Sequence, residues 1–428
     1  MDPIPLKKKK HSEDDKNEEQ KSESVFVNFV NAGGEELANE FSIKKDENRE
    51  SLNTLINKVL GNEEKRPYSF YVEGFEVTST LKEALERTSY KSENVIKIQY
   101  NPEAIFEVKP LTRATSTLEC HLGEILCIAF SPDGQTMASG SGDSTVRLWD
   151  ITTETPMAKC EGHKGWVLCL AWSPDCNLLA SGSMDNKICI WEPNGKLRGK
   201  LSGHSKWVTS IAWEPIHLRA PCVRLVSSSK DSTVRIWNIL SLSVEVTISV
   251  HTDTVTKVLW GGTGLIYSGS HDRTVKVWND KGKLVRSLDG HAHWVNTLAL
   301  STEHILRTGS YDYTNQKFKN AEEMKVYAGK RYKEALLAGG PNNHEKLVSG
   351  SDDFTMIMWD PTHSKKAICR MTGHQQLINH AAFSPSGLIL ASASFDKSIK
   401  LWNGLNGKYI GSLRGHVGSV YQVISISF

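Results

Sequence analysis

The chain has 428 residues, and its 51 Lys and Arg residues against 49 Asp and Glu residues give a formal net charge of +2. So balanced a charge argues against a surface that coats nucleic acid generally, although local basic patches are compatible with it. The eight cysteines are scattered with no C-x-x-C pair, which gives neither a zinc pattern nor a disulfide framework and favours a reducing compartment. No apolar stretch approaches the roughly 18 residues of a membrane span, so we expect no membrane contact and no signal peptide.

Residues 1–23 are polar and charged without periodicity, so we expect a disordered tail. Within this tail, "PLKKKKHSE" has the composition of a short nuclear import signal, but many solvated lysine runs have the same composition. The sequence leaves both interpretations open.

Residues 24–108 predict a compact block. Strands are expected at "VFVNFV" and "EFSIKK", a helix at "SLNTLINKVLG" with Ser51 as N-cap, and a hairpin of "YSFYV" and "FEVTS" around Glu73-Gly74. "TLKEALE" predicts a second, short helix, and "NVIKIQY" predicts a last strand. This order is that of a ubiquitin-like α+β roll. Because no Gly-Gly processing end follows it, we expect a fixed recognition domain and not a conjugatable tag.

Residues 109–428 are dominated by an internal repeat. Segments such as "SGSGDSTVRLWD" and "SGSHDRTVKVWN" recur at intervals of about 40 residues, which is the period of WD repeats. Apolar runs of strand length, parted by turn residues such as Asp133-Gly134, predict small antiparallel sheets. The sequence therefore resembles the WD-repeat family and predicts a mainly β protein, with the α+β roll followed by a WD40 β-propeller.

Each repeat keeps four side chains in register: a leading His, then Ser, Asp and Trp at spacings of four and six residues. These sets resemble the buried network of WD repeats, in which Asp accepts from imidazole and Ser accepts from the Trp indole. A His-Asp-Ser trio also resembles a hydrolase triad, but an enzyme needs one such site and not six, so we expect no catalytic residue. The predicted tetrads are His121, Ser139, Asp143, Trp149; His163, Ser181, Asp185, Trp191; His204, Ser227, Asp231, Trp237; His251, Ser268, Asp272, Trp278; His291, Ser349, Asp353, Trp359; and His374, Ser392, Asp396, Trp402.

The fifth repeat carries an insert at residues 311–346. Its apolar residues follow a helical spacing, and this predicted face comprises Met324, Tyr327, Ala328, Tyr332, Ala335 and Leu336. The basic residues lie largely off this face, and they are Lys325, Lys330, Arg331 and Lys333. Either the helix packs on the propeller rim with a solvated basic face, or that face contacts RNA.

Longer stretches look like the Notchless family of ribosome assembly factors, in which a ubiquitin-like domain directly precedes a WD propeller. They include "NPEAIFEVKPLTRATSTLECH", "GHAHWVNTLALSTEHILRTGS" and "SASFDKSIKLWNGLNGKYIGSLRGHVGSVYQV", and the resemblance runs from about residue 24 to residue 423. It implies a non-catalytic assembly factor for the large (60S) ribosomal subunit, in the nucleus and nucleolus. The propeller would dock on the pre-60S particle, with its ribosomal proteins and rRNA, and the ubiquitin-like domain would bind midasin, a very large AAA-type ATPase.

The resemblance also implies a contact residue. The acidic residue that the family presents to the metal-ion-dependent adhesion site of midasin falls on Glu76, just after the hairpin turn, with Glu73 as the nearby alternative. A divalent cation, magnesium, would be held by midasin, and a carboxylate oxygen from this chain would fill its open position. We expect no cofactor and no metal site within the chain itself.

A second class of function stays open at this point: a WD40 adaptor in Notch signalling or in substrate selection by a ubiquitin ligase. The two classes differ in what should co-purify, which is midasin and ribosomal precursor RNA in one case and ligase subunits in the other. An enzyme is disfavoured because no Walker loop, metal cluster or single nucleophile stands out. In either class we expect a monomer.

The family closes its ring with eight blades. Here six complete repeats are followed by a predicted seventh inner strand at "SVYQVISIS", while "TRATSTLEC" resembles the outer strand that closes the last blade. We therefore expect a propeller that lacks most of its last two blades and exposes strand edges.

Overall fold

The computed structural model describes residues 24–31, 37, 41–60, 68–72, 75–77, 80–86, 95–102, 117–312, 318, 320–338 and 344–424. The chain divides into two compact units, Met1–Ala114 and Thr115–Phe428, each of which has its own core. The tail predicted at residues 1–23 lies outside the described residues.

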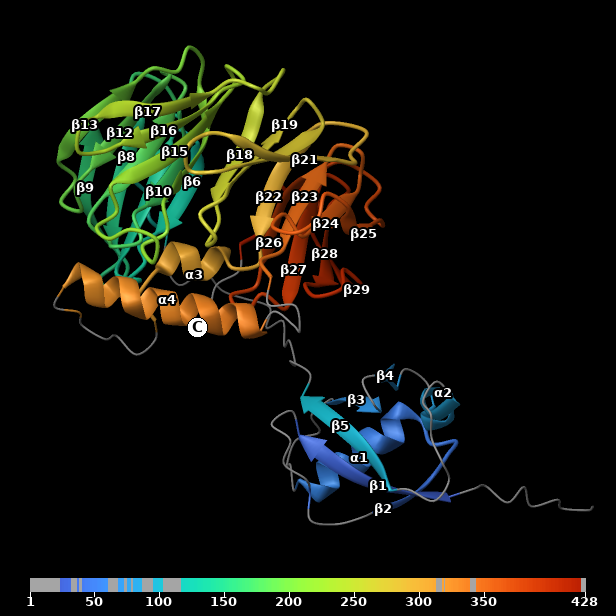
Figure 1. The fold of residues 1–428 in the computed structure, drawn as a ribbon. Helices are drawn as coiled ribbons and strands as arrows, with labels where there is room; N and C mark the ends of the chain where they lie inside the picture. Colours follow the sequence, from blue (N-terminus) through green and yellow to red (C-terminus); the bar gives the residue numbers. More distant parts are fainter. Residues whose placement is uncertain are drawn as a thin grey trace, which may run out of the picture. The chain divides into compact units, whose positions relative to one another are not determined.

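The N-terminal unit is a mixed five-stranded sheet with the strand order β2-β1-β5-β3-β4 (Figure 1). Its elements are β1 (Ser24–Asn31), β2 (Phe41–Lys44), α1 (Arg49–Val59), β3 (Tyr68–Val72), β4 (Phe75–Glu76), α2 (Leu81–Glu86) and β5 (Ile96–Pro102). β1 runs parallel to β5 and antiparallel to β2, so the first and last strands of the unit lie side by side. Leu52 and Ile56 of α1 are buried with Phe29, Phe70 and Ile98 of the sheet, and this packing gives the α+β roll its core.

The start of α1 differs from the prediction. The helix begins at Arg49 with Asn48 as N-cap, and not after Ser51. The carbonyl of Asn48 accepts hydrogen bonds from the backbone N–H groups of Ser51 (3.0 Å) and Leu52 (3.2 Å). Asn48 also forms a β-bridge with Thr80. This tertiary pairing holds Asn48 in an extended conformation, so the first helical turn forms directly after it.

The second unit contains six four-stranded antiparallel sheets, each made of four consecutive strands (Figure 1). Blade 1 consists of β6 (Ile125–Phe130), β7 (Thr136–Ser141), β8 (Thr145–Asp150) and β9 (Thr155–Glu161). Blades 2 and 3 consist of β10 (Val167–Trp172), β11 (Leu179–Ser183), β12 (Lys187–Trp191), β13 (Leu197–Ser202); and β14 (Val208–Trp213), β15 (Arg224–Ser229), β16 (Val234–Asn238), β17 (Ser243–Ile248). Blades 4, 5 and 6 consist of β18 (Val255–Trp260), β19 (Ile266–Ser270), β20 (Thr274–Trp278), β21 (Leu284–Asp289); β22 (Val295–Leu300), β23 (Leu347–Ser351), β24 (Met356–Trp359), β25 (Ala367–Met371); and β26 (Ile378–Phe383), β27 (Ile389–Ser394), β28 (Ser398–Asn403), β29 (Tyr409–Arg414).

Neighbouring blades pack through their first strands, which lie next to one another in the order β6, β10, β14, β18, β22 and β26. The second strands are almost wholly buried, since their small Ser, Gly and Ala residues allow the sheets to approach closely. The predicted fold class is confirmed: an α+β roll precedes a WD40 propeller of four-stranded blades.

The connection between β22 and β23 contains two helices, α3 (Glu303–Thr308) and α4 (Ala321–Ala338), which lie along one end of the blades (Figure 1). It leaves the blade earlier than the predicted insert at 311, because "EHILRT" already forms the helix α3. Ala328 packs into the core shared by blades 2 and 3, and Tyr332 packs into the core shared by blades 4 and 5. The helix therefore braces four blades with the apolar face that its spacing predicts. Among the described residues, no helix is long and apolar enough to span a bilayer.

The segment expected to form a seventh inner strand runs beside β26 but is not a strand over residues 419–424, as far as it is described. The N–H of Val420 donates to the carbonyl of Ser394 (3.1 Å), and Asn379 Nδ2 donates to the carbonyl of Tyr421 (2.6 Å). The expected outer strand at 112–120 is described only from residue 117, and residues 117–120 are not strand.

Candidate functional site

The predicted tetrad of blade 3 illustrates how the repeated polar residues meet. His204 Nδ1 donates to Asp231 Oδ2 (2.9 Å), and the Ser227 hydroxyl donates to His204 Nε2 (2.8 Å). Trp237 Nε1 donates in turn to Ser227 Oγ (2.8 Å). This arrangement uses a neutral imidazole, with one ring nitrogen as donor and the other as acceptor.

The same bonds occur in all six blades. The His–Asp distances are 2.9, 3.0, 2.9, 2.6, 2.9 and 2.7 Å in blades 1 to 6. In each blade the Trp indole donates to the tetrad Ser, at 2.7 to 2.9 Å. A serine oxygen that is buried and bonded on both sides has no free path to a substrate, so the tetrads join strands and carry no nucleophile.

The electrostatics of the tetrads depend on this bonding. Burial raises the pKa of Asp231, but hydrogen bonds from His204, Thr233 and the backbone of Ser205 outweigh burial and hold the pKa below the usual range. Burial lowers the pKa of His251, although Asp272 partly opposes this shift. The network therefore favours an ionised Asp beside a neutral His.

The hairpin that carries the predicted acidic contact is formed by β3 and β4. Glu76 belongs to β4 and pairs with Tyr71, while Phe75 pairs with Val72. Glu73 lies outside the described residues. The backbone thus places Glu76 one residue beyond the first pair after the turn, and its role as a ligand stays a prediction.

The predicted basic residues of the insert lie on α4, but they do not share one environment. Lys330 and Lys333 are exposed, and Lys325 is half-buried. Arg331 instead turns toward the end of α3, where its Nη1 donates to the carbonyls of Gly309 (2.7 Å) and Tyr311. Its guanidinium is therefore engaged in holding the two helices together.

Three tryptophans stand at the opposite end of the first strands, directly before β10, β14 and β22. Trp166 and Trp294 are 51% and 44% exposed, values that are high for so large an apolar side chain. Lys230 Nζ lies 3.9 Å from the centre of the Trp207 ring, and His271 stacks on Trp294 at 4.4 Å. Exposed tryptophans of this kind are typical of protein interfaces.

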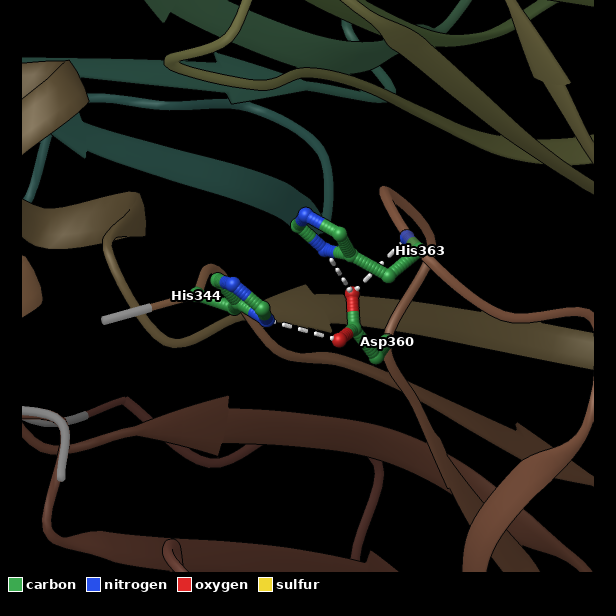
Figure 2. A group of neighbouring side chains, drawn as sticks. All are labelled: His344, Asp360 and His363. Carbon is green, nitrogen blue, oxygen red and sulfur yellow. Dashed lines mark hydrogen bonds and ion pairs between the residues drawn. The ribbon is translucent and has the colours of Figure 1, made fainter. Parts of the chain in front are cut away.

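One cluster was not expected from the sequence. His344, Asp360 and His363 meet at the edge of blade 5, and Figure 2 shows both imidazoles directed at the carboxylate of Asp360. In the described part of the chain this is the one group of His, Cys, Asp and Glu side chains with the spacing of metal ligands. Asp360 and His363 are three residues apart in one loop, but they match no metal-binding motif, and only the fold brings His344 to them.

Comparison with known proteins agrees with this architecture. The model of the NLE (NUC135) domain matches residues 25–85. The model of the WD domain, G-beta repeat, matches residues 112–150, 154–192, 195–238, 243–279 and 365–403. These ranges omit β22, β23 and β24 of blade 5, the blade that α3 and α4 interrupt.

Full-length relatives decide the family. The chain is 48% identical over 370 residues to the Notchless protein homolog of Arabidopsis thaliana, covering 86% of this chain and 77% of that protein. It is 44% identical over 387 residues to Protein Notchless of Drosophila melanogaster, covering 89% and 78%. The chain belongs to the Notchless family. Another relative is Ribosome assembly protein 4 of Saccharomyces cerevisiae, 46% identical over 381 residues, covering 84% of this chain and 74% of that protein. The predicted resemblance to the Notchless family is thereby confirmed.

Proposed function

We propose that the chain is a non-catalytic assembly factor for the large (60S) ribosomal subunit, acting in the nucleus and nucleolus. The observation that carries the proposal is its 46% identity, over 84% of its length, to a yeast protein named Ribosome assembly protein 4. The tetrads support a scaffold in preference to an enzyme, because their serines are buried and bonded on both sides.

In this proposal the propeller binds the pre-60S particle through two surfaces at opposite ends of the blades. The exposed Trp166 and Trp294 at one end suit a ribosomal protein, since such side chains anchor protein interfaces. Lys325, Lys330 and Lys333 on α4, at the other end, suit rRNA phosphates. Arg331 is left out of this contact because it binds carbonyls beside α3.

The N-terminal unit would bind midasin through Glu76. Support comes from the position of Glu76 on β4, immediately after the hairpin turn. A carboxylate that completes the shell of a magnesium ion held by midasin makes the contact both metal-dependent and directional. The chain would then link the particle to the ATPase.

The midasin contact is tested by binding of the whole chain to the adhesion domain of midasin, in magnesium and in chelator. Glu76→Ala should abolish the metal-dependent binding, and Glu76→Asp should weaken it because the shorter side chain misplaces the oxygen. Glu83→Ala, which changes an exposed carboxylate on α2, is the control and should bind as wild type. Normal binding by Glu76→Ala in magnesium would overturn the assignment and direct the test to Glu73.

The RNA contact is tested by sedimentation with pre-60S particles at several salt concentrations. Replacing Lys325, Lys330 and Lys333 by Glu should reduce co-sedimentation and flatten its salt dependence, since fewer counterions are released. The matched control replaces Lys281, Lys365 and Lys366, which are exposed and do not belong to α4, by Glu. Equal co-sedimentation of the two triple variants would mean that α4 has a structural role only.

The alternative is an adaptor in Notch signalling or in ubiquitin-ligase substrate selection. The same exposed tryptophans are compatible with it, because they do not distinguish a ribosomal protein from another protein partner. Ligase subunits in place of precursor rRNA among the co-purifying molecules would support it.

A further inference from the structure

Blade 5 brings two histidines to one carboxylate. His344 lies just before β23, Asp360 is the first residue after β24, and His363 follows in the same loop. His344 Nδ1 lies 2.9 Å from Asp360 Oδ2, and His363 Nδ1 lies 3.2 Å from Asp360 Oδ1. One donor atom from each residue therefore lies within 4.8 Å of the other two.

The two rings are held in parallel. Their centroids are 3.6 Å apart and their planes differ by 11° (Figure 2). Because both Nδ1 atoms are directed at the same carboxylate, the three donors converge on a common point. This convergence comes from two chain segments that are joined through the ladder between β23 and β24.

Asp360 also has a structural role in its loop, which is separate from metal binding. Its Oδ1 accepts hydrogen bonds from Thr362 Oγ1 (2.8 Å) and from the N–H of His363 (3.2 Å), and so closes the loop. The residue at the same position in blades 3 and 6 is Asn238 or Asn403, whose Oδ1 accepts the N–H two residues on at 2.9 and 2.8 Å.

An asparagine is thus sufficient to close this loop in two other blades. The loop explains one oxygen of Asp360, but it explains neither the negative charge nor the second oxygen, which faces His344. The histidine at 344 comes from the connection that contains α3 and α4, which only blade 5 possesses among the described residues. The cluster is therefore an addition to the repeat and not part of it.

The chemistry of the three donors selects a class of metal. Two imidazole nitrogens and one carboxylate oxygen suit zinc and its neighbours nickel and copper, whereas magnesium and calcium prefer shells of oxygen. Zinc bonds of about 2.0–2.1 Å place tetrahedral ligand atoms about 3.4 Å apart. The two His–Asp donor pairs of the cluster, at 2.9 and 3.2 Å, are already slightly closer than that spacing. The donors therefore need only a small readjustment, for which His363 has room because its side chain is 57% exposed.

The surroundings keep the cluster in place. Arg286 Nη1 donates to the carbonyl of Pro361 (2.7 Å) and ties the loop to β21. The nearby Lys346 ammonium donates to the carbonyl of Leu405 (3.1 Å). Hydrogen bonds from Thr362, His344 and His363 outweigh the effect of burial and lower the pKa of Asp360 to about 2, so its carboxylate is ionised at neutral pH.

We propose that His344, Asp360 and His363 bind one divalent transition metal of the zinc class, with water completing its coordination shell. All three protein ligands of this site come from this chain, so the site is distinct from the magnesium site that we propose for midasin. A metal here would fasten the loop after β24 to the segment that returns from α4, and so would tie the insert to the rim of blade 5.

The test is a titration of the untagged, chelator-stripped chain with Co²⁺, followed by its visible absorption and then by displacement with Zn²⁺. We expect one tight equivalent for wild type. Asp360→Asn, which keeps the loop bond as in blades 3 and 6, and His363→Ala should each weaken binding by about tenfold or more. The matched control is Asp150→Asn, which changes the corresponding loop of blade 1, where Asp150 accepts from Thr152 N at 2.8 Å. It should bind as wild type.

Several results would overturn the proposal. These are the absence of a tight equivalent in wild type, or equal binding by Asp360→Asn, His363→Ala and Asp150→Asn, which would place any bound metal elsewhere. Circular dichroism and melting show whether each variant is folded. If His363→Ala does not fold, anomalous scattering from a zinc-soaked crystal of the wild type replaces it: a peak among the three side chains supports the site, and its absence refutes it.

Discussion

Histidine meets aspartate in two different settings in this propeller. In the blade 3 tetrad the side chains of His204 and Asp231 are 1% and 5% exposed, and both are bonded to further groups of the same blade. In the blade 5 cluster the side chains of His363 and Asp360 are 57% and 18% exposed. The comparison teaches that residue type alone does not define a site. Burial and saturated bonding make the first setting structural, whereas access to solvent makes the second available to a ligand.

The largest effect is expected from a single substitution in the buried tetrad of blade 3. Asp231→Asn replaces one acceptor oxygen by an NH₂ group, which then faces either the donors of His204 and Ser205 or those of Thr233. We expect the free energy of unfolding to fall by about 2–4 kcal/mol, the range for breaking a buried charged network. Urea unfolding followed by tryptophan fluorescence measures it. A loss below about 0.5 kcal/mol would mean that the tetrads do not hold the blades as described.

Lowering the pH should reduce the free energy of unfolding that the buried tetrad histidines contribute. Burial lowers the pKa of His251 and of His374 in the folded chain, so the unfolded chain, with a pKa near 6.5, binds more protons. Their stabilising contribution is complete above about pH 6.5 and is lost as the pH falls toward their folded values, at up to about 1.4 kcal/mol per pH unit for one group. Unfolding measured from pH 7 to pH 4 should show this decline.

Between pH 7 and about pH 5, Asp360→Asn should give a parallel decline, because Asp360 is ionised in both the folded and the unfolded chain over that range. A flat profile for wild type would contradict the assignment of neutral, buried tetrad histidines.

The smallest expected effect is that of Asp360→Asn on stability in the absence of metal. The loop bond is kept and only a partly exposed ion pair is lost, so the free energy of unfolding should fall by less than about 1 kcal/mol. Chemical unfolding beside Asp231→Asn, in the same chelating buffer, provides the measurement. A loss equal to that of Asp231→Asn would erase the distinction between the two settings.

The tetrads were accessible to sequence reasoning because their spacing repeats. The Ser, Asp and Trp spacing of Ser139, Asp143 and Trp149 recurs in every blade. The two-residue strand period places Ser139 and Trp149 on a defined face of β7 and β8, and Asp143 lies in the turn between these strands. The apolar face of α4 was accessible for the same reason, since Ala328 and Tyr332 follow the helical period.

Features that depend on a single tertiary contact cannot be predicted from the sequence pattern. Asn48 caps α1 in place of Ser51 because Asn48 pairs with Thr80, which lies far along the chain. The sequence places Arg331 among the lysines of α4, whereas its guanidinium binds the carbonyl of Gly309 at the end of α3. The His344 cluster likewise depends on where α4 returns the chain to β23. None of these contacts has a period, so the sequence alone carries no signal for them.

The most direct measurement of the central claim is affinity purification of the full chain at low salt, with sequencing of the bound RNA and identification of the bound proteins. We expect precursor rRNA of the large subunit, proteins of the 60S particle and midasin. Glu76→Ala should lose midasin while it keeps the RNA, because the two contacts belong to different units of the chain. Ligase subunits without ribosomal precursor RNA would contradict the proposed assembly function and favour the adaptor.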